Sequence, residues 1–160
     1  MRTITIKQPY ASLIVEGIKD IENRTWNTKF RGRVLIHSSA KGACKRDDYH
    51  KLLTTRQWEY LGVVPCLNML SSNYNYDNAA IIGSVEIVDC VINHPSIWAD
   101  KTIGGCIPNI DTHIIYNWVL ANPILFDNPI RNVKGRLSFW DYDLTICNTC
   151  EQPFSSSCVE

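Results

Sequence analysis

The sequence predicts an α+β fold in which several short strands form a small mixed barrel with helices attached to it. Strand-like segments recur along the chain, at residues 3–7, 33–37, 79–92 and 113–121. One amphipathic helical pattern directly follows the first strand. A second helical region, at 43–62, separates the strand at 33–37 from the strand at 79–92. Strands therefore outnumber helices, and a curled sheet is the natural way for them to share one core.

The N-terminal third predicts a strand, a helix and two further strands. Residues 3–7 alternate between apolar and polar residues, as a half-buried strand does. A helix is expected from Pro9 to Gly17, which is a plausible C-cap. Residues 20–26 are expected to form a short strand or turn with Ile21 inward. The helix has its apolar residues at Ala11, Leu13, Ile14, Val15 and Ile18.

The middle and the C-terminal part contain the longest strand pattern. Residues 63–78 are rich in turn formers and predict a surface loop. Residues 79–92 are the strongest strand, and Ser84 and Glu86 interrupt its apolar run. Residues 113–121 predict another strand, which Asn122-Pro123 should end. A last strand is expected in VKGRLSFWDYDL, where Gly135 can turn the chain.

Composition indicates one domain in a reducing, aqueous compartment. The chain has 160 residues, 45% of them apolar, which is enough for one ordinary core. No apolar run approaches the ~20 residues that span a bilayer, and the N-terminus lacks the apolar region of a signal peptide. We therefore expect no membrane association and a cytoplasmic location. The expected organisation is a domain at 1–144, with a variable helical and loop insertion at 42–78, and a polar tail at 145–160.

The seven cysteines do not predict a disulfide framework or a metal centre. Their number is odd and most are scattered, which is typical of free thiols. Cys147 and Cys150 have the spacing of a zinc half-site, but no second pair or nearby histidine completes it. With Cys158 they are interpreted as incidental residues of the tail, and a zinc site shared with a second chain is the alternative. No metal or cofactor is expected.

Charge is balanced overall but unevenly distributed. Residues 1–60 contain 12 Lys and Arg against six Asp and Glu, whereas residues 61–160 contain four against ten. A net charge of zero argues against indiscriminate binding of polyanions. A local site for a nucleic acid or another anionic ligand remains compatible with the basic first part.

The segment GIKDIENR places Lys19, Glu22 and Arg24 within six residues. In one interpretation Glu22 is a half-buried carboxylate held by the two cations, and the group has a structural role. In the other, the three line a cleft that binds a polar planar ligand. Glu22 would then accept from a base, Arg24 would grip a phosphate with its planar fork, and Lys19 would supply a cation or, if deprotonated, a base.

Other candidates are expected around the same cleft. Tyr10, Trp26 and Trp118 either stack against a base or pack in the core. His37 and Ser38 end a strand that points to this region, where a histidine is usually a hydrogen-bonded structural residue. Glu86 is a possible second carboxylate, with a solvent-facing strand residue as the alternative.

Two of these segments, KQPYASLIVEGIKDIENRTW and RGRVLIHSSAK, resemble the ASCH family, the activating-signal-cointegrator homology domains of the PUA-like superfamily. The segments IIGSVEIVDC, YNWVLANPILF and VKGRLSFWDYDL follow the pattern of that family in the same order. The resemblance covers about residues 3–143, apart from 42–78. It implies a PUA-like pseudo-barrel with a cleft between the early helix and the sheet.

The resemblance also implies a function. Members are associated with RNA or DNA, which predicts a module that binds RNA, single-stranded DNA or a modified nucleoside. One bacterial branch hydrolyses N4-acetylcytidine and related nucleosides; Lys19 matches its lysine, and Glu22 stands where it has a threonine. An amidohydrolase using Lys19 with Glu22 or Glu86 is therefore one alternative. A protein-interaction module in transcription coactivation is the other.

Overall fold

The computed structural model describes residues 1–62, 74–102, 114–144 and 152–153. Among these residues, no helix combines the length and the apolar character needed to cross a membrane. The tail cysteines Cys147, Cys150 and Cys158 lie outside the described residues. The elements, in chain order, are β1 (Arg2–Ile6), α1 (Tyr10–Val15), β2 (Ile21–Arg24), β3 (Gly32–Ser38), the 3₁₀ helix η1 (Arg46–Leu52), α2 (Thr55–Gly62), β4 (Ala80–Ile92), β5 (Tyr116–Ile130) and β6 (Phe139–Asp141).

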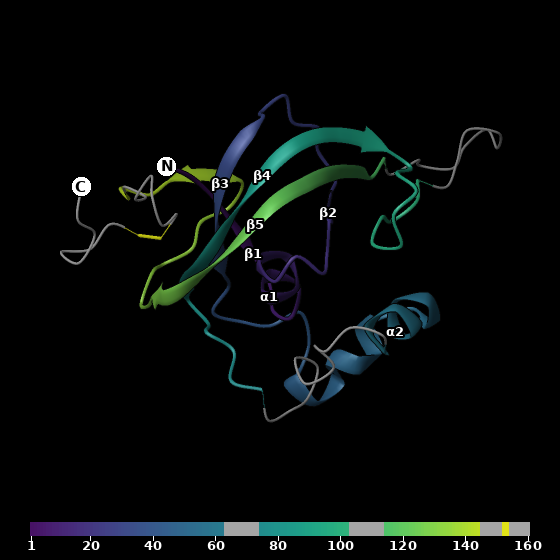
Figure 1. Cartoon of the computed structure of the whole chain (residues 1–160), viewed down its shortest axis with the longest axis horizontal. Helices are drawn as coiled ribbons and strands as arrows, with labels where there is room; N and C mark the ends of the chain where they lie inside the picture. Colours follow the sequence, from purple (N-terminus) through teal and green to yellow (C-terminus); the bar gives the residue numbers. More distant parts are fainter. Residues whose placement is uncertain (63–73, 103–113, 145–151, 154–160) are drawn as a thin grey trace.

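The strands form one six-stranded sheet in the order β2-β5-β4-β3-β1-β6. The β1 and β3 strands are parallel, and the other neighbouring pairs are antiparallel. The sheet curls along the long strands β4 and β5 (Figure 1). The α+β class is therefore confirmed, and the expected barrel is a half-barrel in which the edge strands β2 and β6 do not pair with each other.

The core is organised around α1, whose residues 11–15 are all buried. This helix packs against β3, β4 and β5 and lies between the sheet and α2 (Figure 1). Ile14 and Val15 join the cluster that covers the inner face of the sheet. Leu13 points the other way, into a cluster with Ile21 and Leu61. The short helix thus joins two apolar layers, which is why almost every one of its side chains is apolar.

Both ends of α1 follow from the sequence. The buried Gln8 side chain accepts a hydrogen bond from the Ser12 amide at 3.1 Å, which satisfies one free N–H of the first turn. The C-cap is Glu16, and the predicted Gly17 follows it at C′ with a φ of +76°, the position and conformation in which glycine commonly ends a helix. The amides of Ile18 and Lys19 both donate to Leu13 O at 2.9 Å. These bonds set the direction in which the chain leaves the helix toward β2.

The helical region 43–62 consists of two pieces, η1 and α2. Leu53 is extended between them, with φ −105° and ψ 141°. Thr54 and Gln57 then bond reciprocally, Gln57 N to Thr54 Oγ1 at 3.3 Å and Thr54 N to Gln57 Oε1 at 2.8 Å. This is a capping box, which starts a new helix at this point.

The prediction that Asn122-Pro123 ends a strand is wrong, because β5 continues to Ile130. Its pairing with β4 shifts register between Ser84 and Glu86, and Asn122 has a φ of 48°. Pro123 therefore lies at an irregularity of the ladder, where its missing N–H breaks no regular bond. A proline at such a bulge bends the strand instead of ending it.

The packing of α1 on the sheet predicts the effect of adding one methyl group to β4. A Cβ at Gly83 would lie 2.2 Å from Ile124 O and 2.8 Å from Val15 Cγ1, so Gly83→Ala must push α1 and β5 away. We expect it to lower the free energy of unfolding by about 3 kcal/mol in urea titrations. At Gly62 a Cβ meets nothing within 4 Å. Gly62→Ala is therefore the control, and equal stability of the two variants would contradict the packing described.

Candidate functional site

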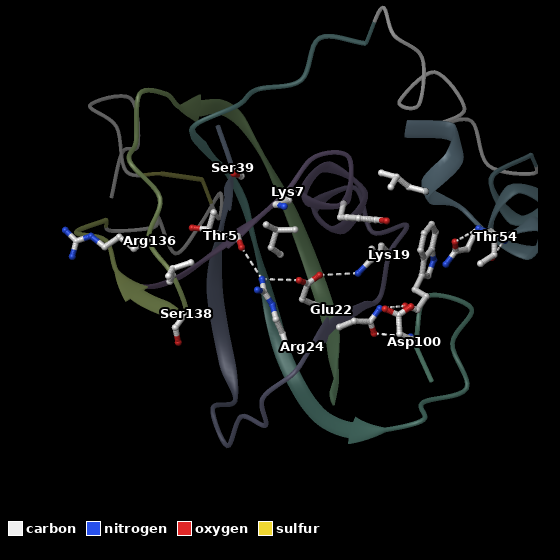
Figure 2. A pocket seen from close by; sticks show the side chains of 17 residues that line it. Thr5, Lys7, Lys19, Glu22, Arg24, Ser39, Thr54, Asp100, Arg136 and Ser138 are labelled. Atoms are coloured by element: carbon white, nitrogen blue, oxygen red, sulfur yellow. Dashed lines mark hydrogen bonds and ion pairs between the residues drawn. The ribbon is translucent and has the colours of Figure 1, made fainter. Parts of the chain in front are cut away.

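A cleft of about 500 Å³ opens where the end of β1, the start of α1 and the edge strand β2 meet. Residues from the η1–α2 junction and around Trp98 form one side. The segment 136–138, before β6, forms the other. Figure 2 shows Arg136 and Ser138 on the side opposite Thr54 and Asp100, with Glu22 between them. Six segments that are distant in sequence therefore contribute to one concave surface.

Glu22 lies in the cleft between two cations. Its Oε2 is 3.2 Å from Lys19 Nζ, and its Oε1 is 3.0 Å from Arg24 Nη2. Arg24 Nη2 also donates to Thr5 O at 3.1 Å, so the four residues form one chain of contacts from β1 to the end of α1 (Figure 2). The side chains of Lys19 and Glu22 are only 5% and 12% exposed. The carboxylate is therefore fixed in position before any ligand arrives.

Local structure accounts for this geometry. Side chains alternate along a strand, so Glu22 and Arg24 share one face of β2, and Ile21 takes its place in the core on the other. Lys19 precedes β2, and its Nζ also donates to Ile21 O. The contacts that the structural interpretation expects are present. The same three side chains line a cleft, as the ligand-binding interpretation requires.

Tyr10 forms part of the wall next to this group. Lys19 Nζ is 5.6 Å from the centre of the Tyr10 ring, within the range of a cation–π contact. Burial raises the pKa of the Tyr10 hydroxyl, and the negative charges of Asp100 and Glu22 act in the same direction. The hydroxyl therefore keeps its proton at neutral pH and presents a donor.

Asn23 and Asn117 hold the segment that carries Trp98 and Asp100. Asn23 Nδ2 donates to Trp98 O at 2.9 Å, and its Oδ1 accepts from the Asp100 amide at 3.1 Å. The buried Asn117 donates to Asn23 Oδ1 at 2.9 Å and to Asp100 O at 3.0 Å. Sequence reasoning missed these residues. Asn23 alone had a signal, since it lies inside the GIKDIENR motif.

Lys7 and Arg136 bring further positive charge to the rim of the cleft. Both are exposed and line it, and among the described residues neither forms an ion pair. Among the described residues, those that line the cleft carry four cations, Lys7, Lys19, Arg24 and Arg136, against two carboxylates, Glu22 and Asp100. The cleft is therefore net positive. The sequence showed this only as the excess of basic residues in its first part.

Trp26 and Trp118 do not line the cleft. Trp118 is 1% exposed, and its indole N–H donates to Trp26 O at 3.3 Å. The rings of Trp26 and Trp118 meet edge to face at 4.5 Å, and Phe139 stacks on Trp118 at 5.1 Å. Arg24 covers another part of the Trp118 ring, 6.0 Å from its centre. Both tryptophans therefore pack in the core, one of the two alternatives that the sequence left open. Of the three aromatic candidates, Tyr10 alone lines the cleft.

His37 and Ser38 are buried away from Glu22. His37 Nε2 lies 2.9 Å from Val133 O, and burial lowers the pKa of His37 below its ordinary 6.5. Ser38 Oγ donates to Asp77 O at 2.5 Å. Glu86 lies on β4, outside the cleft, where it pairs with Arg33 at 3.3 Å and accepts from Asn122 at 2.9 Å. The cleft therefore brings together Tyr10, Lys19, Glu22 and Arg24 from the predicted set.

Within the described part of the chain, no three His, Cys, Asp or Glu side chains are grouped as metal ligands would be. Cys44 and Cys90 are free thiols there. Glu22 already has a cation on each oxygen.

The family model described as the ASCH domain matches residues 4–130, a range that runs from within β1 to the end of β5 and holds most of the cleft. The chain belongs to the ASCH domain family. It is 29% identical to human Activating signal cointegrator 1 over 93 residues, 55% of this chain and 14% of that protein. It is 28% identical to the mouse protein of the same name over 152 residues, which are 89% of this chain and 22% of that protein. This ASCH domain thus spans at most about a fifth of the length of these relatives.

Solved structures support the fold of the ASCH domain. The ASCH protein from Zymomonas mobilis and a point mutant of it each superpose with a TM-score of 0.50 at 13% identity. The superpositions cover 89% of this chain and 87% and 90% of those chains. At this identity the likeness concerns the fold alone. It agrees with the PUA-like architecture that the sequence resemblance implied.

The ion pairs of Glu22 predict a large stability effect. Glu22→Gln leaves Lys19 and Arg24 in the cleft without a compensating carboxylate, so the free energy of unfolding should fall by about 3 kcal/mol. Glu86→Gln is the matched control on β4. Its carboxylate is 34% exposed, so the loss there should stay below about 1 kcal/mol. Urea unfolding of both variants measures the difference, and equal losses would show that the Glu22 pairs contribute little.

Proposed function

We propose that this ASCH domain binds RNA, single-stranded DNA or a modified nucleoside in the cleft around Lys19, Glu22 and Arg24. The observation that carries the proposal is the fixed Glu22 carboxylate at the centre of a net-positive cleft. A carboxylate has about four acceptor positions, and the two cations occupy one on each oxygen. The remaining positions suit the amino or imino N–H groups on the edge of a base.

The size and lining of the cleft support a nucleotide as the ligand. A volume of about 500 Å³ is within the ~300–1,000 Å³ typical of small-molecule sites. Tyr10 and Leu52 are partly exposed and contribute apolar surface to the cleft, against which a base can stack. An open, polar cleft of this kind also favours ligand binding over a purely structural role, the premise of the protein-interaction alternative.

The rim cations are the best candidates for phosphate contacts. The sequence suggested Arg24 for this role, but its Nη2 is already shared by Glu22 and Thr5 O. Lys7 and Arg136 have no such partners among the described residues. We therefore assign base recognition to Glu22 and phosphate binding to Lys7 and Arg136.

The hydrolytic alternative requires Lys19 to act as a base. Its Nζ donates to both Ile21 O and Glu22, so two of the hydrogen bonds of this nitrogen go to the protein itself and not to a substrate. Glu86, the other suggested proton carrier, lies outside the cleft. The contacts of Lys19 therefore favour binding without turnover.

Binding should depend on salt through the rim. In fluorescence titrations with short single-stranded RNA and DNA, affinity should fall as salt is raised from 50 to 200 mM. Lys7→Ala should reduce the slope of log K against log salt by about 0.7, the value for one single-strand phosphate contact. Lys29→Ala removes the same charge from an exposed position outside the cleft and should leave the slope unchanged. An affinity that does not change with salt, or an equal change of the slope in the two variants, would refute the phosphate assignment.

The enzymatic alternative has its own test. Incubation of the protein with N4-acetylcytidine, followed by chromatography of cytidine, should give no release above the level without protein. Lys19→Ala should give the same trace. Cytidine release by the wild type that Lys19→Ala abolishes would establish the amidohydrolase instead.

A further inference from the structure

A second cavity adjoins the cleft on the far side of Arg136. It has a volume of about 690 Å³ and lies over the buried His37, between the segment 132–137 and the end of β1. Thr5, Ser39, Arg136 and Leu137 line both cavities. The two are therefore neighbouring parts of one groove, and Arg136 and Leu137 mark the boundary between them.

The charge of this second cavity matches that of a nucleic-acid backbone. Lys134 and Arg136 line it, and among the described residues no carboxylate does. Both cations are exposed and have no ion-pair partner within the described ranges. Figure 2 shows the Arg136 side chain extending away from Glu22, so its guanidinium is placed at the boundary and not over the floor of the first cleft.

Leu137 stands at the boundary with 95% of its surface exposed. Exposure this complete is unusual for a leucine, because it leaves a large apolar side chain in water. An apolar side chain between two cavities of nucleotide size can insert between consecutive bases. Val133 and Ala79 supply further apolar surface on the second side.

Close packing holds the segment in this position. A Cβ at Gly135 would lie 2.5 Å from His37 Cε1 and 2.9 Å from Thr5 Oγ1, so only glycine lets the backbone rest directly on these two side chains. Val133 belongs to the same segment as Gly135, and its carbonyl oxygen forms a hydrogen bond with His37 Nε2 on β3. Lys134, Arg136 and Leu137 are thus carried by an anchored backbone, which is what a preformed subsite requires.

From these observations we infer that the second cavity is a subsite for the adjacent nucleotide of a single-stranded nucleic acid. The inference rests on the proposed function of the first cleft and extends it, since it makes an oligonucleotide and not a lone nucleoside the ligand. The phosphodiester between the two nucleotides lies at Arg136. One base occupies the cleft of Glu22, the next lies over Val133, and Leu137 separates them.

The test compares ligands of one and two nucleotides on the full 160-residue chain. Calorimetric titrations use the four nucleoside 5′-monophosphates and the four corresponding dinucleoside monophosphates, ApA, CpC, GpG and UpU. The dinucleotides carry less negative charge than the monophosphates, so tighter binding of a dinucleotide reports contacts to its second nucleoside and not charge. For the preferred base we expect the dinucleotide to bind roughly tenfold more tightly.

Two variants separate the second subsite from the first. Leu137→Ser and Lys134→Ala should each weaken dinucleotide binding about threefold to tenfold and leave monophosphate binding unchanged. Both residues are exposed, so folding should survive, and Lys29→Ala is the control for Lys134→Ala. If the wild type binds the monophosphate and the dinucleotide with equal affinity, the second subsite alone is overturned. The same holds if each variant lowers the affinity for both ligands equally. Absence of binding to every ligand would overturn the proposed function and the subsite together.

Discussion

The ion pairs of Glu22 are the interaction on which the cleft depends. Removing a carboxylate from water is costly, and Glu22 offsets this cost with a cation on each oxygen. The two cations come from different places, Lys19 from the connection between α1 and β2 and Arg24 from β2 itself, and Arg24 also holds β1 through Thr5 O. One buried charge thus ties this connection to two strands of the sheet. The same arrangement leaves an excess of positive charge in the cleft, which an anionic ligand can neutralise.

The local part of this arrangement was readable from the sequence because it lies within one short segment. The helix pattern, its Gly17 C-cap and the alternation of β2 are set by residues close together in the chain, and they place Glu22 between its partners. Asp100 and Arg136 reach the cleft only through the pairing of distant strands. Neither the length nor the register of these strands can be deduced from local pattern, as the continuation of β5 past Pro123 shows.

The alternation of side-chain directions along β3 explains why His37, a predicted site residue, lies outside the cleft. Val34 and Ile36 of β3 point into the core next to α1, so Leu35 and His37 point to the opposite face, and a bulge follows Ile36. Every residue from Val34 to Ser38 is buried, so the apolar and polar alternation that normally reveals parity is missing. A shift of one residue would have exchanged the two faces. His37 therefore supports the segment 132–137 from below and does not face Glu22.

The contrast between floor and rim suggests how affinity and selectivity are divided. Glu22 is largely buried, and its two cations leave some of its acceptor positions free. A base that covers Glu22 but cannot donate to it would leave such a position without a hydrogen bond, at a cost of about 1–3 kcal/mol. In the proposed mode of binding, discrimination among bases would therefore depend on Glu22. Lys7 and Arg136 are exposed, so their attraction for phosphate would be the same for every base and would be screened by salt. In the proposed mode of binding, Glu22 would recognise one base, and the rim cations would hold the strand on either side of it by charge.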